Sequence, residues 1–589
     1  MDKIVMIIPP FSGEGLCSSS SYCRRPFDYV MFNNVATILK QKYTVSVFDL
    51  DLDGVVITQD YIDNIREAKI QIIFATEKHA DTVIQKYIDL ATCTSLIIGP
   101  GSKNIKDNTV FRIIGEPEYT ILSTVDSILS EADDQSYQTV WTTEFGDLSM
   151  LPQTAHDNLE KLIGSGGYPS VVFARGCNNA CLFCRSNEYY VPGKREYRRR
   201  PVEHIVSEIS MLLKKGQSWV HLECESMEPG IPNDEIWMYL DEIKKLGINY
   251  STFCNILPLS DIVFTLALKD SGCKYVFIGI ESANDSILKE MRKPHNSLDA
   301  KKAVENLNSA GIQFGIGFLP FNPYSTAQTL LKDMYFLKSI TSSNLSHPWN
   351  ICCFMNVCIM DDPYIFDIQV SNIYIHFQKV FDEMVIPQIT SWEKELRIFP
   401  ERYSAIVPQF EREALFDCLT QICTEHIYKN ARIKLVCKND AEFLNVLMNC
   451  TTVLQILNEV PTELQDWIDA INEWSHDDDE EDYIVFDENT PIGWLGVNGL
   501  LDENKKAYLK MAVFLPDYQG QGFGSFAIQE VMCHLKHRGI KQIILYTDKD
   551  NYRAQACYKK CGFRIVESLV ETMSNGKDVP RFKMETHWE

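Results

Sequence analysis

Two successive series of short apolar runs, each run followed by a helix-like stretch, constrain the fold of this chain more than any other feature. The first series occupies residues 1 to about 130, and its runs are KIVMIIPP, YTVSVFDLD, IQIIFAT, SLIIGPG and FRIIGE. Helical patterns such as NNVATILKQK and ADTVIQKYIDL lie between several of them. This rhythm predicts an open, parallel, doubly wound sheet, whose ligands bind in the loops at the carboxyl ends of the strands.

The second series begins at about residue 165 with YPSVVFARG. It continues through WVHLECE, YSTFCNI, YVFIGIES and FGIGFLP, each followed by a helix-like stretch. Five or more such units predict a partial or full β/α barrel, with a site at the carboxyl ends of its strands.

The remaining organisation follows from length and local composition. A chain of 589 residues is too long for one core, and we expect three or four domains in an α/β multidomain fold. We expect a linker over about 131–150 and an acidic, solvated hinge over 473–482, with no readable motif in the helical region before that hinge. The predicted parts are a doubly wound domain (1–135), a β/α barrel (150–345), a mostly helical connecting region (346–470) and a compact α+β domain (483–589).

Charge and hydropathy restrict the classes of partner. The net charge of −24 opposes binding of nucleic acid, and Lys194, Arg195 and Arg198–Arg200, the one dense basic cluster, are expected to form a solvated rim. No apolar stretch is long enough for a membrane span, and the first residues lack the features of a secretory signal. We therefore expect a cytoplasmic protein that does not associate with membranes.

Three of the 19 cysteines have a spacing that predicts a metal cluster. In ARGCNNACLFCRSN, Cys177, Cys181 and Cys184 lie on one short loop after the apolar strand YPSVVFA. Thiolates are suitable ligands for iron, and three of them leave one iron of a [4Fe–4S] cluster open. A zinc site is the alternative, but it needs a fourth Cys or His at matching spacing, and none follows nearby.

CNNACLFC, with the aromatic Phe183 before the third cysteine, resembles the signature of the radical S-adenosylmethionine (SAM) superfamily. In that family the open iron is chelated by SAM, and one electron cleaves SAM to a 5′-deoxyadenosyl radical that abstracts hydrogen from substrate. The resemblance implies an electron donor such as flavodoxin or ferredoxin. It also makes Glu223 and Glu225 in HLECES, and Glu281 and Ser282 in GIESAND, candidates for SAM contacts, with FLPFNP (318–323) lining the far side.

A doubly wound domain ahead of such a barrel resembles the cobalamin-binding class of radical SAM enzymes, which often methylate unactivated carbon. IIGPGSK, IIGEPEYTIL and the LPQ turn (151–153) carry this resemblance, and small residues in such loops allow close approach of a corrinoid. The chain departs from the class in having Gly-Pro-Gly where a Gly-Gly pair is expected. It has no Asp-x-His-x-x-Gly, and His79 is expected on a surface helix, so a histidine ligand to cobalt is not predicted. A domain that keeps the fold without cobalamin is the alternative.

The carboxy-terminal segment resembles the GNAT acetyltransferase fold, through LKMAVFLPDYQGQGFG followed by DKDNYRAQACYKKCGF. Glycines before a helix let backbone N–H groups approach a phosphate. The resemblance implies that acetyl-CoA binds Gln519, Gly520, Gln521, Gly522 and Gly524, and that Asn551 contacts the pantetheine arm. Tyr558 would protonate the leaving thiolate, since an ordinary phenol keeps its proton at neutral pH. The general base is not assigned.

Three functions remain open at this level. The first is a bifunctional tailoring enzyme that modifies an unactivated carbon, by methylation above all, and acylates an amine on a small natural product or peptide. The second resembles the elongator catalytic subunit, which joins radical SAM and GNAT domains and modifies tRNA; the negative charge, the cysteine spacing and the additional sheet argue against it. The third is a radical SAM enzyme with non-catalytic terminal domains.

Overall fold

The protein is described here by a computed structural model of the whole chain. The residues described are 2–9, 28–53, 57–76, 81–107, 109–130, 139–164, 167–186, 189–340, 367–385, 387, 412–573 and 576–588. The chain divides into two compact units: unit 1 comprises 1–319, 338–356 and 381–412, and unit 2 comprises 320–337, 357–380 and 413–589.

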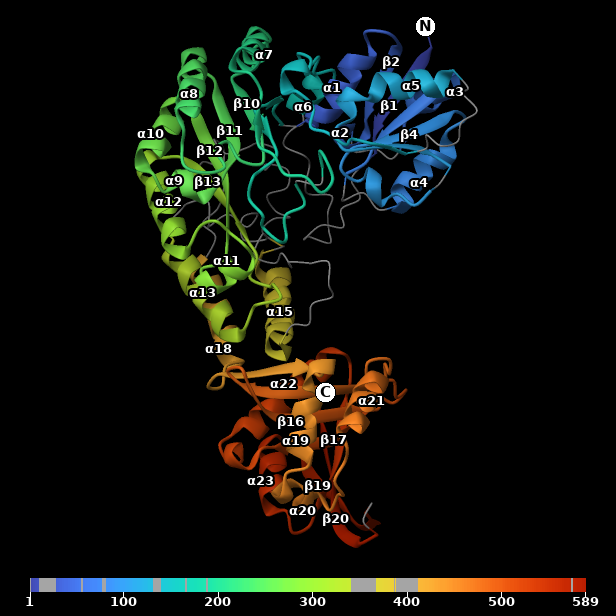
Figure 1. Ribbon diagram of the computed structural model, residues 1–589, viewed down its shortest axis with the longest axis vertical. Coiled ribbons are helices and arrows are strands. Elements are labelled where there is room, and N and C mark those ends of the chain that lie inside the picture. Colours follow the sequence, from blue (N-terminus) through green and yellow to red (C-terminus); the bar gives the residue numbers. More distant parts are fainter. Residues whose placement is uncertain are drawn as a thin grey trace. The chain divides into compact units, whose positions relative to one another are not determined.

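The first sheet of unit 1 has six parallel strands in the order β2-β1-β3-β4-β5-β6 (blue in Figure 1). The strands are β1 (Lys3–Ile8), β2 (Thr44–Asp49), β3 (Ile70–Phe74), β4 (Thr94–Ile98), β5 (Phe111–Ile114) and β6 (Thr139–Trp141). All five apolar runs of the first series are strands, which confirms the predicted doubly wound sheet. The strand β6 lies inside the segment expected to be a linker, where it pairs with β5.

Helices cover both faces of this sheet because its strands are apolar on both faces. The helices are α1 (Val30–Leu39), α2 (Leu50–Asp53), α3 (Gln59–Glu67), α4 (Asp81–Leu90) and α5 (Ile121–Leu129). Alternate β1 residues belong to different cores: Met6 packs with residues of α1 and α5, whereas Ile7 packs with residues of α3 and α4.

The second sheet of unit 1 has five parallel strands in the order β13-β12-β11-β10-β7 (green in Figure 1). They are β7 (Ser170–Val172), β10 (Trp219–Glu223), β11 (Asn249–Cys254), β12 (Cys273–Glu281) and β13 (Gln313–Phe318). A short ribbon joins β8 (Ala174–Arg175) to β9 (Arg198–Arg199). Strands in sequential order, each followed by helical structure, form the predicted partial β/α barrel.

The helices of this part are α6 (Leu159–Gly164), α7 (Val202–Lys214), α8 (Asp234–Leu246), α9 (Ile256–Leu259), α10 (Ile262–Asp270), α11 (Asp285–Glu290) and α12 (Ser297–Ala310). Three of them, α8, α10 and α12, begin at a residue whose side chain accepts a backbone hydrogen bond from the first turn. In α8, the Asn233 side chain accepts a hydrogen bond from Ile236 N, and Gly247 closes the helix with φ of 64°.

Unit 2 is built on a seven-stranded sheet in the order β14-β15-β16-β17-β18-β20-β19, in which only β17 and β18 run parallel (orange and red in Figure 1). Its strands are β14 (Ala431–Leu435), β15 (Glu480–Asp487), β16 (Thr490–Asn498), β17 (Lys506–Phe514), β18 (Gln542–Asp548), β19 (Arg564–Thr572) and β20 (Asp578–His587). Helices wholly or mostly in this unit are α13 (Ala327–Ser339), α15 (Ile368–Val380), α18 (Arg412–Glu425), α19 (Ala441–Met448), α20 (Thr451–Leu457), α21 (Leu464–Trp474), α22 (Phe523–His537) and α23 (Tyr552–Lys560).

Two features of this sheet differ from expectation. The strand β14 precedes residue 483, the predicted start of the domain, and extends the sheet as a partner of β15. The expected solvated hinge is also partly wrong, because residues 480–482 begin β15 and Asp482 is buried beneath Trp494, whose Nε1 donates to its carboxylate at 2.7 Å. No helix in the described part of the chain is long and apolar enough to span a bilayer.

A buried histidine links the two sheets of unit 1. His156 lies between them in the chain, with Nδ1 3.0 Å from Asp28 Oδ2 and Nε2 3.4 Å from Glu208 Oε1. Burial alone would lower the pKa of His156, but hydrogen bonds and attraction from Asp28 and Glu208 outweigh it and raise the pKa to about 9. His156 is therefore protonated at neutral pH and bridges two buried carboxylates.

This bridge predicts a specific pH dependence of stability. A histidine pKa raised from 6.5 to about 9 stabilises the fold fully below pH 6.5 and loses that effect as pH rises through 9. Over this range the wild type should lose up to about 3 kcal/mol of unfolding free energy that the His156→Gln variant does not lose. Urea denaturation at pH 6 and pH 10 measures the difference. His295→Gln is the control: burial lowers the pKa of His295 to about 3, so His295 destabilises the fold only below about pH 6.5, where the unfolded chain is protonated, and its removal should leave the loss at high pH in place. An identical pH slope in wild type and His156→Gln would contradict the bridge.

Candidate functional sites

The three cysteines predicted to bind a cluster line one pocket at the carboxyl end of the barrel strands. The loop that carries them leaves the barrel after β7 and β8, and Cys177, Cys181 and Cys184 all face a cavity of about 470 Å³. Cys177 and Cys181 are buried, whereas Cys184 is half-buried with its Sγ 3.0 Å from Ser186 Oγ. Three thiols on the lining of one cavity are a donor set that fits an iron–sulfur cluster.

Glu225 holds the start of this loop. Its carboxylate accepts hydrogen bonds from Gly176 N at 2.7 Å and from the Tyr190 hydroxyl at 2.5 Å. Gly176 has φ of 79°, and a Cβ there would lie 2.0 Å from Glu196 O, so only glycine fits immediately before the first cysteine. The predicted Glu225 thus lines the pocket and also positions the cysteine loop.

Glu223, the other candidate for contact with the SAM amino group, lines the same pocket. Burial raises the pKa of its carboxyl group to about 8, although Arg175 opposes the shift. A cation bound beside Glu223 would oppose this shift and favour the ionised carboxylate.

Glu281 and Phe183 both lie close to Lys293, a residue that was not among the candidates predicted from the sequence. Glu281 has φ of 67°, and its Oε1 lies 3.3 Å from Lys293 Nζ. The same ammonium group lies 5.7 Å from the centre of the Phe183 ring. All three side chains line the pocket, whereas the predicted Ser282 is fully buried and is not part of the lining.

Loops of the doubly wound domain form the other wall of this pocket. Tyr29 and Met31 at the start of α1, Phe74 at the end of β3, and Pro100 after β4 line it. Gly101, which follows Pro100, is also required for packing: a Cβ there would lie 2.3 Å from Thr76 O in the neighbouring loop. His79 lies outside the described residues.

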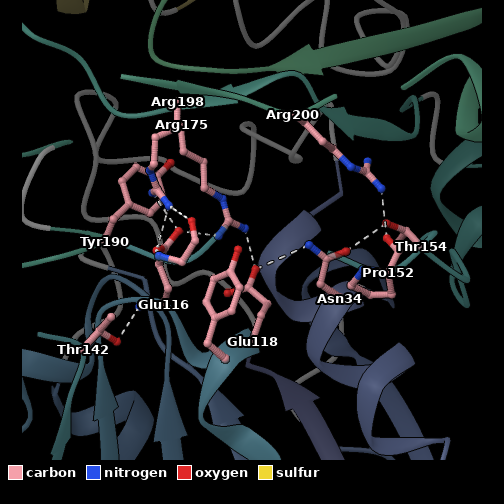
Figure 2. Close-up of polar contacts among 12 residues, drawn as sticks. Asn34, Glu116, Glu118, Thr142, Pro152, Thr154, Arg175, Tyr190, Arg198 and Arg200 are labelled. Carbon is pink, nitrogen blue, oxygen red and sulfur yellow. Dashed lines mark hydrogen bonds and ion pairs between the residues drawn. The ribbon is translucent and has the colours of Figure 1, made fainter. Parts of the chain in front are cut away.

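The segment resembling the cobalamin class, GEPEY, forms buried ion pairs with the barrel (Figure 2). Arg175, two residues before Cys177, places Nη1 2.9 Å from Glu116 and Nη2 2.5 Å from Glu118. All three side chains are at most 1% exposed. Arg198 adds a second pair with Glu116 at 2.9 Å.

The expected solvated basic rim is therefore wrong for residues 198–200. Arg199 pairs with Glu228, and Arg200 pairs with Glu208 at 2.7 Å. Arg200 also donates to Pro152 O at 3.1 Å (Figure 2). Their side chains are at most 10% exposed, because tertiary contacts supply a carboxylate for each cation. Pro152 belongs to the LPQ turn, which this hydrogen bond joins to the barrel.

Unit 2 contains a second cavity, of about 520 Å³, where β17 and β18 separate. These strands pair only over Lys506–Tyr508 and Gln542–Ile544, although β17 continues to Phe514 and β18 to Asp548. The unpaired parts of both strands line the cavity.

The predicted acetyl-CoA residues converge on this cavity with one exception. Gln519, Gly520, Gly522, Gly524, Asn551 and Tyr558 line it, whereas Gln521 does not and donates to Asp517 O at 2.7 Å. Gly520 and Gly522 have φ of 74° and 96°, and Gly522 caps the 15-residue helix α22. Backbone N–H groups at such a helix start are suited to a pyrophosphate.

Tyr558 is suited to keep its proton in this cavity. Burial raises the pKa of its phenol far above the ordinary value. Lys510 on β17 also lines the cavity and lies 3.1 Å from Asp482. Sequence reasoning missed this pair because Asp482 is distant in the chain and its burial depends on the fold of the sheet.

Comparisons with known proteins assign both regions. Residues 171–334 match the model of the radical SAM superfamily, and residues 447–563 match the acetyltransferase (GNAT) family. Bacteriochlorophyllide d C-8(2)-methyltransferase of Chlorobaculum tepidum is 31% identical over 170 residues, covering 28% of this chain and 37% of that protein. Mycothiol acetyltransferase of Saccharomonospora viridis is 45% identical over 56 residues, covering 10% of this chain and 18% of that protein. The chain thus spans less than half the length of either relative.

The fold is also similar to that of a solved structure, the cobalamin-dependent SAM radical enzyme OxsB with aqua-cobalamin and SAM bound. The TM-score is 0.56 at 15% identity, and the match covers 81% of this chain and 79% of that chain. The two matched families imply an enzyme whose cofactors are a [4Fe–4S] cluster, SAM and acetyl-CoA. The chain joins a domain of the radical SAM superfamily to a domain of the GNAT acetyltransferase family.

Proposed function

We propose that this protein is a bifunctional tailoring enzyme. Unit 1 would bind cobalamin beside the cluster and methylate an unactivated carbon, and unit 2 would transfer an acetyl group to an amine. The acceptor would be a small natural product or a short peptide. Catalysts that share an intermediate benefit from the high effective concentration that a fusion provides.

One observation carries the first half of this proposal. The pocket that Cys177, Cys181 and Cys184 line is completed by loops from the carboxyl ends of the doubly wound strands. Doubly wound sheets bind ligands at that edge. A corrinoid bound there would therefore lie next to the cluster. This arrangement is consistent with the fold likeness to OxsB and with the methylation named for the Chlorobaculum relative.

The pocket's charges fit a cationic amino acid derivative. The described lining contains Glu223, Glu225 and Glu281 together with two cations, Lys293 and Arg175. Arg175 is already paired with two carboxylates behind the pocket. A carboxylate attracts an amino or sulfonium group, and a lysine attracts a carboxylate. We infer that Glu225 or Glu223 binds the SAM amino group and that Lys293, paired with Glu281, orients the SAM carboxylate.

The aromatic lining fits the flat face of a corrinoid and helps to exclude water. Tyr29, Phe74, Phe253 and Phe277 line the pocket, and the lining within the described residues includes no histidine. We therefore propose that cobalamin binds without a histidine ligand from this pocket. When bound, the cluster, SAM and cobalamin supply hydrogen abstraction and a methyl group, while the chain orients them.

The second half rests on the cavity between β17 and β18. Its glycine loop would hold the pyrophosphate, Asn551 would contact the pantetheine arm, and Tyr558 would return a proton to the leaving thiolate. An electron donor such as flavodoxin or ferredoxin and a cytoplasmic location complete the proposal.

Anaerobic reconstitution of the full chain with iron, sulfide and hydroxocobalamin tests the radical half. We expect the wild type to retain a corrinoid after desalting and to convert SAM to 5′-deoxyadenosine when reduced. Cys177→Ser should lose cluster iron and 5′-deoxyadenosine formation, because a hydroxyl group is a poor ligand for iron.

Cys254→Ser is the matched control. Cys254 lines the same pocket, but it lies at the end of β11 and not on the loop that carries the three predicted ligands, so it should not bind iron. Equal loss of iron in both variants would contradict the assigned ligands. SAM cleavage without retained corrinoid would exclude the cobalamin-dependent methylation and leave a different radical reaction.

Tyr558→Phe tests the acyl-transfer half. Removal of the general acid should lower the rate of CoA release with a panel of small primary amines by about 10²–10⁴-fold, while acetyl-CoA binding by calorimetry stays unchanged. Tyr508→Phe, a half-exposed hydroxyl on β17 outside the cavity lining, should behave as wild type. A wild-type chain that does not bind acetyl-CoA, or an unchanged rate in Tyr558→Phe, would contradict the assignment.

A further inference from the structure

A cluster of histidine and cysteine side chains in unit 2 lies outside the acetyl-CoA cavity. It is formed by His376 on α15 and by Cys533 and His537 on α22. One possible ligand atom from each residue lies within 4.8 Å of the others, and Cys533 Sγ is 3.5 Å from His537 Nε2. Ligands of a tetrahedral zinc ion, at about 2.0–2.3 Å from the metal, are separated by about 3.4–3.7 Å, so small side-chain rotations would complete the site.

The helix geometry accounts for two of these ligands. Cys533 and His537 are four residues apart on α22, and Glu530 is three residues before Cys533, so all three lie on one face. The helix α15 packs against α22 and presents His376 to this face, since the His376 and His537 rings lie 5.2 Å apart.

A second histidine and a buried carboxylate lie behind His376. His426 Nε2 is 3.3 Å from His376 Nδ1, and His426 Nδ1 is 2.8 Å from Glu530 Oε2. Asn372 Nδ2 donates to the same carboxylate oxygen at 2.9 Å. His426 and Glu530 are both buried, so this chain of hydrogen bonds is shielded from water.

The order of these hydrogen bonds selects one tautomer of each ring. An ionised Glu530 only accepts, so His426 donates through Nδ1–H and its Nε2 accepts. His376 then donates through Nδ1–H, which leaves the lone pair of its Nε2 available. Metal-binding histidines characteristically donate their other ring N–H to a carboxylate or another acceptor in this way.

We propose that His376, Cys533 and His537 bind a zinc-class divalent metal ion, with His426 and Glu530 positioning His376. Two imidazoles and a thiolate are nitrogen and sulfur donors, which favour zinc over magnesium or calcium. Cys533 loses its proton on binding, and three protein ligands leave a fourth position for water. The bound ion would tie α15 to α22, the helix whose first turn follows the glycine loop.

Metal content measured on the full chain tests this site. The iron–sulfur cluster is first reconstituted so that Cys177, Cys181 and Cys184 are occupied, and the protein is then equilibrated with chelator-buffered Zn²⁺. We expect the wild type to bind one zinc ion in addition to the cluster metals, and Co²⁺ in its place should show thiolate charge-transfer absorbance. His376→Ala and Cys533→Ser should lose that ion and that absorbance with iron content unchanged.

Two further variants separate this site from adventitious binding and from misfolding. Cys437→Ser removes an exposed thiol of the same unit outside the cluster and should keep the zinc. Glu530→Gln should weaken zinc binding about 10–100-fold while acetyl-CoA binding persists. If Glu530 only stabilised the fold, its substitution would not lower the zinc affinity selectively. Equal zinc content in wild type and Cys533→Ser would overturn the site, and an unchanged zinc affinity in Glu530→Gln would overturn the positioning role.

Discussion

The buried pairing of Arg175 with Glu116 and Glu118 determines how unit 1 is assembled. These charges have almost no contact with solvent, and removing either partner of such a pair leaves a desolvated charge that costs about 3–5 kcal/mol. Arg175 lies two residues before Cys177, so the same contact that joins the doubly wound domain to the barrel also fixes the cysteine loop. Arg198 strengthens this by pairing with Glu116 from the adjacent strand of a two-stranded ribbon.

This assembly explains why the pocket has two kinds of wall. The barrel supplies the thiols and the carboxylates together with aromatic residues such as Phe253 and Phe277, whereas the side chains from the doubly wound domain are all uncharged. Charged groups in a water-poor cavity interact more strongly with a bound ligand than they would in solvent. The proposed division of tasks follows from this composition: the barrel side orients SAM and the opposite side accommodates the corrinoid.

The parts of the fold that sequence predicted are those governed by local pattern. Continuous apolar runs identify strands that are buried on both faces, and the cysteine spacing and glycine loop are local signals of chemistry. Short or partly polar strands such as β6 and β14 were missed because their pairing depends on a neighbouring strand. The exposure of Arg198–Arg200 was predicted wrongly because sequence does not reveal that distant carboxylates neutralise these cations. Lys293 could have been found only by noticing a lysine twelve residues after Glu281.

The proposed function requires cobalamin and the iron–sulfur cluster to occupy one shared pocket. Electron paramagnetic resonance of the full chain, loaded with cob(II)alamin and measured with the cluster either reduced or omitted, detects their proximity. We expect the reduced cluster to broaden or split the cob(II)alamin signal through magnetic coupling at short range. A cob(II)alamin signal that is identical with and without the reduced cluster would contradict it.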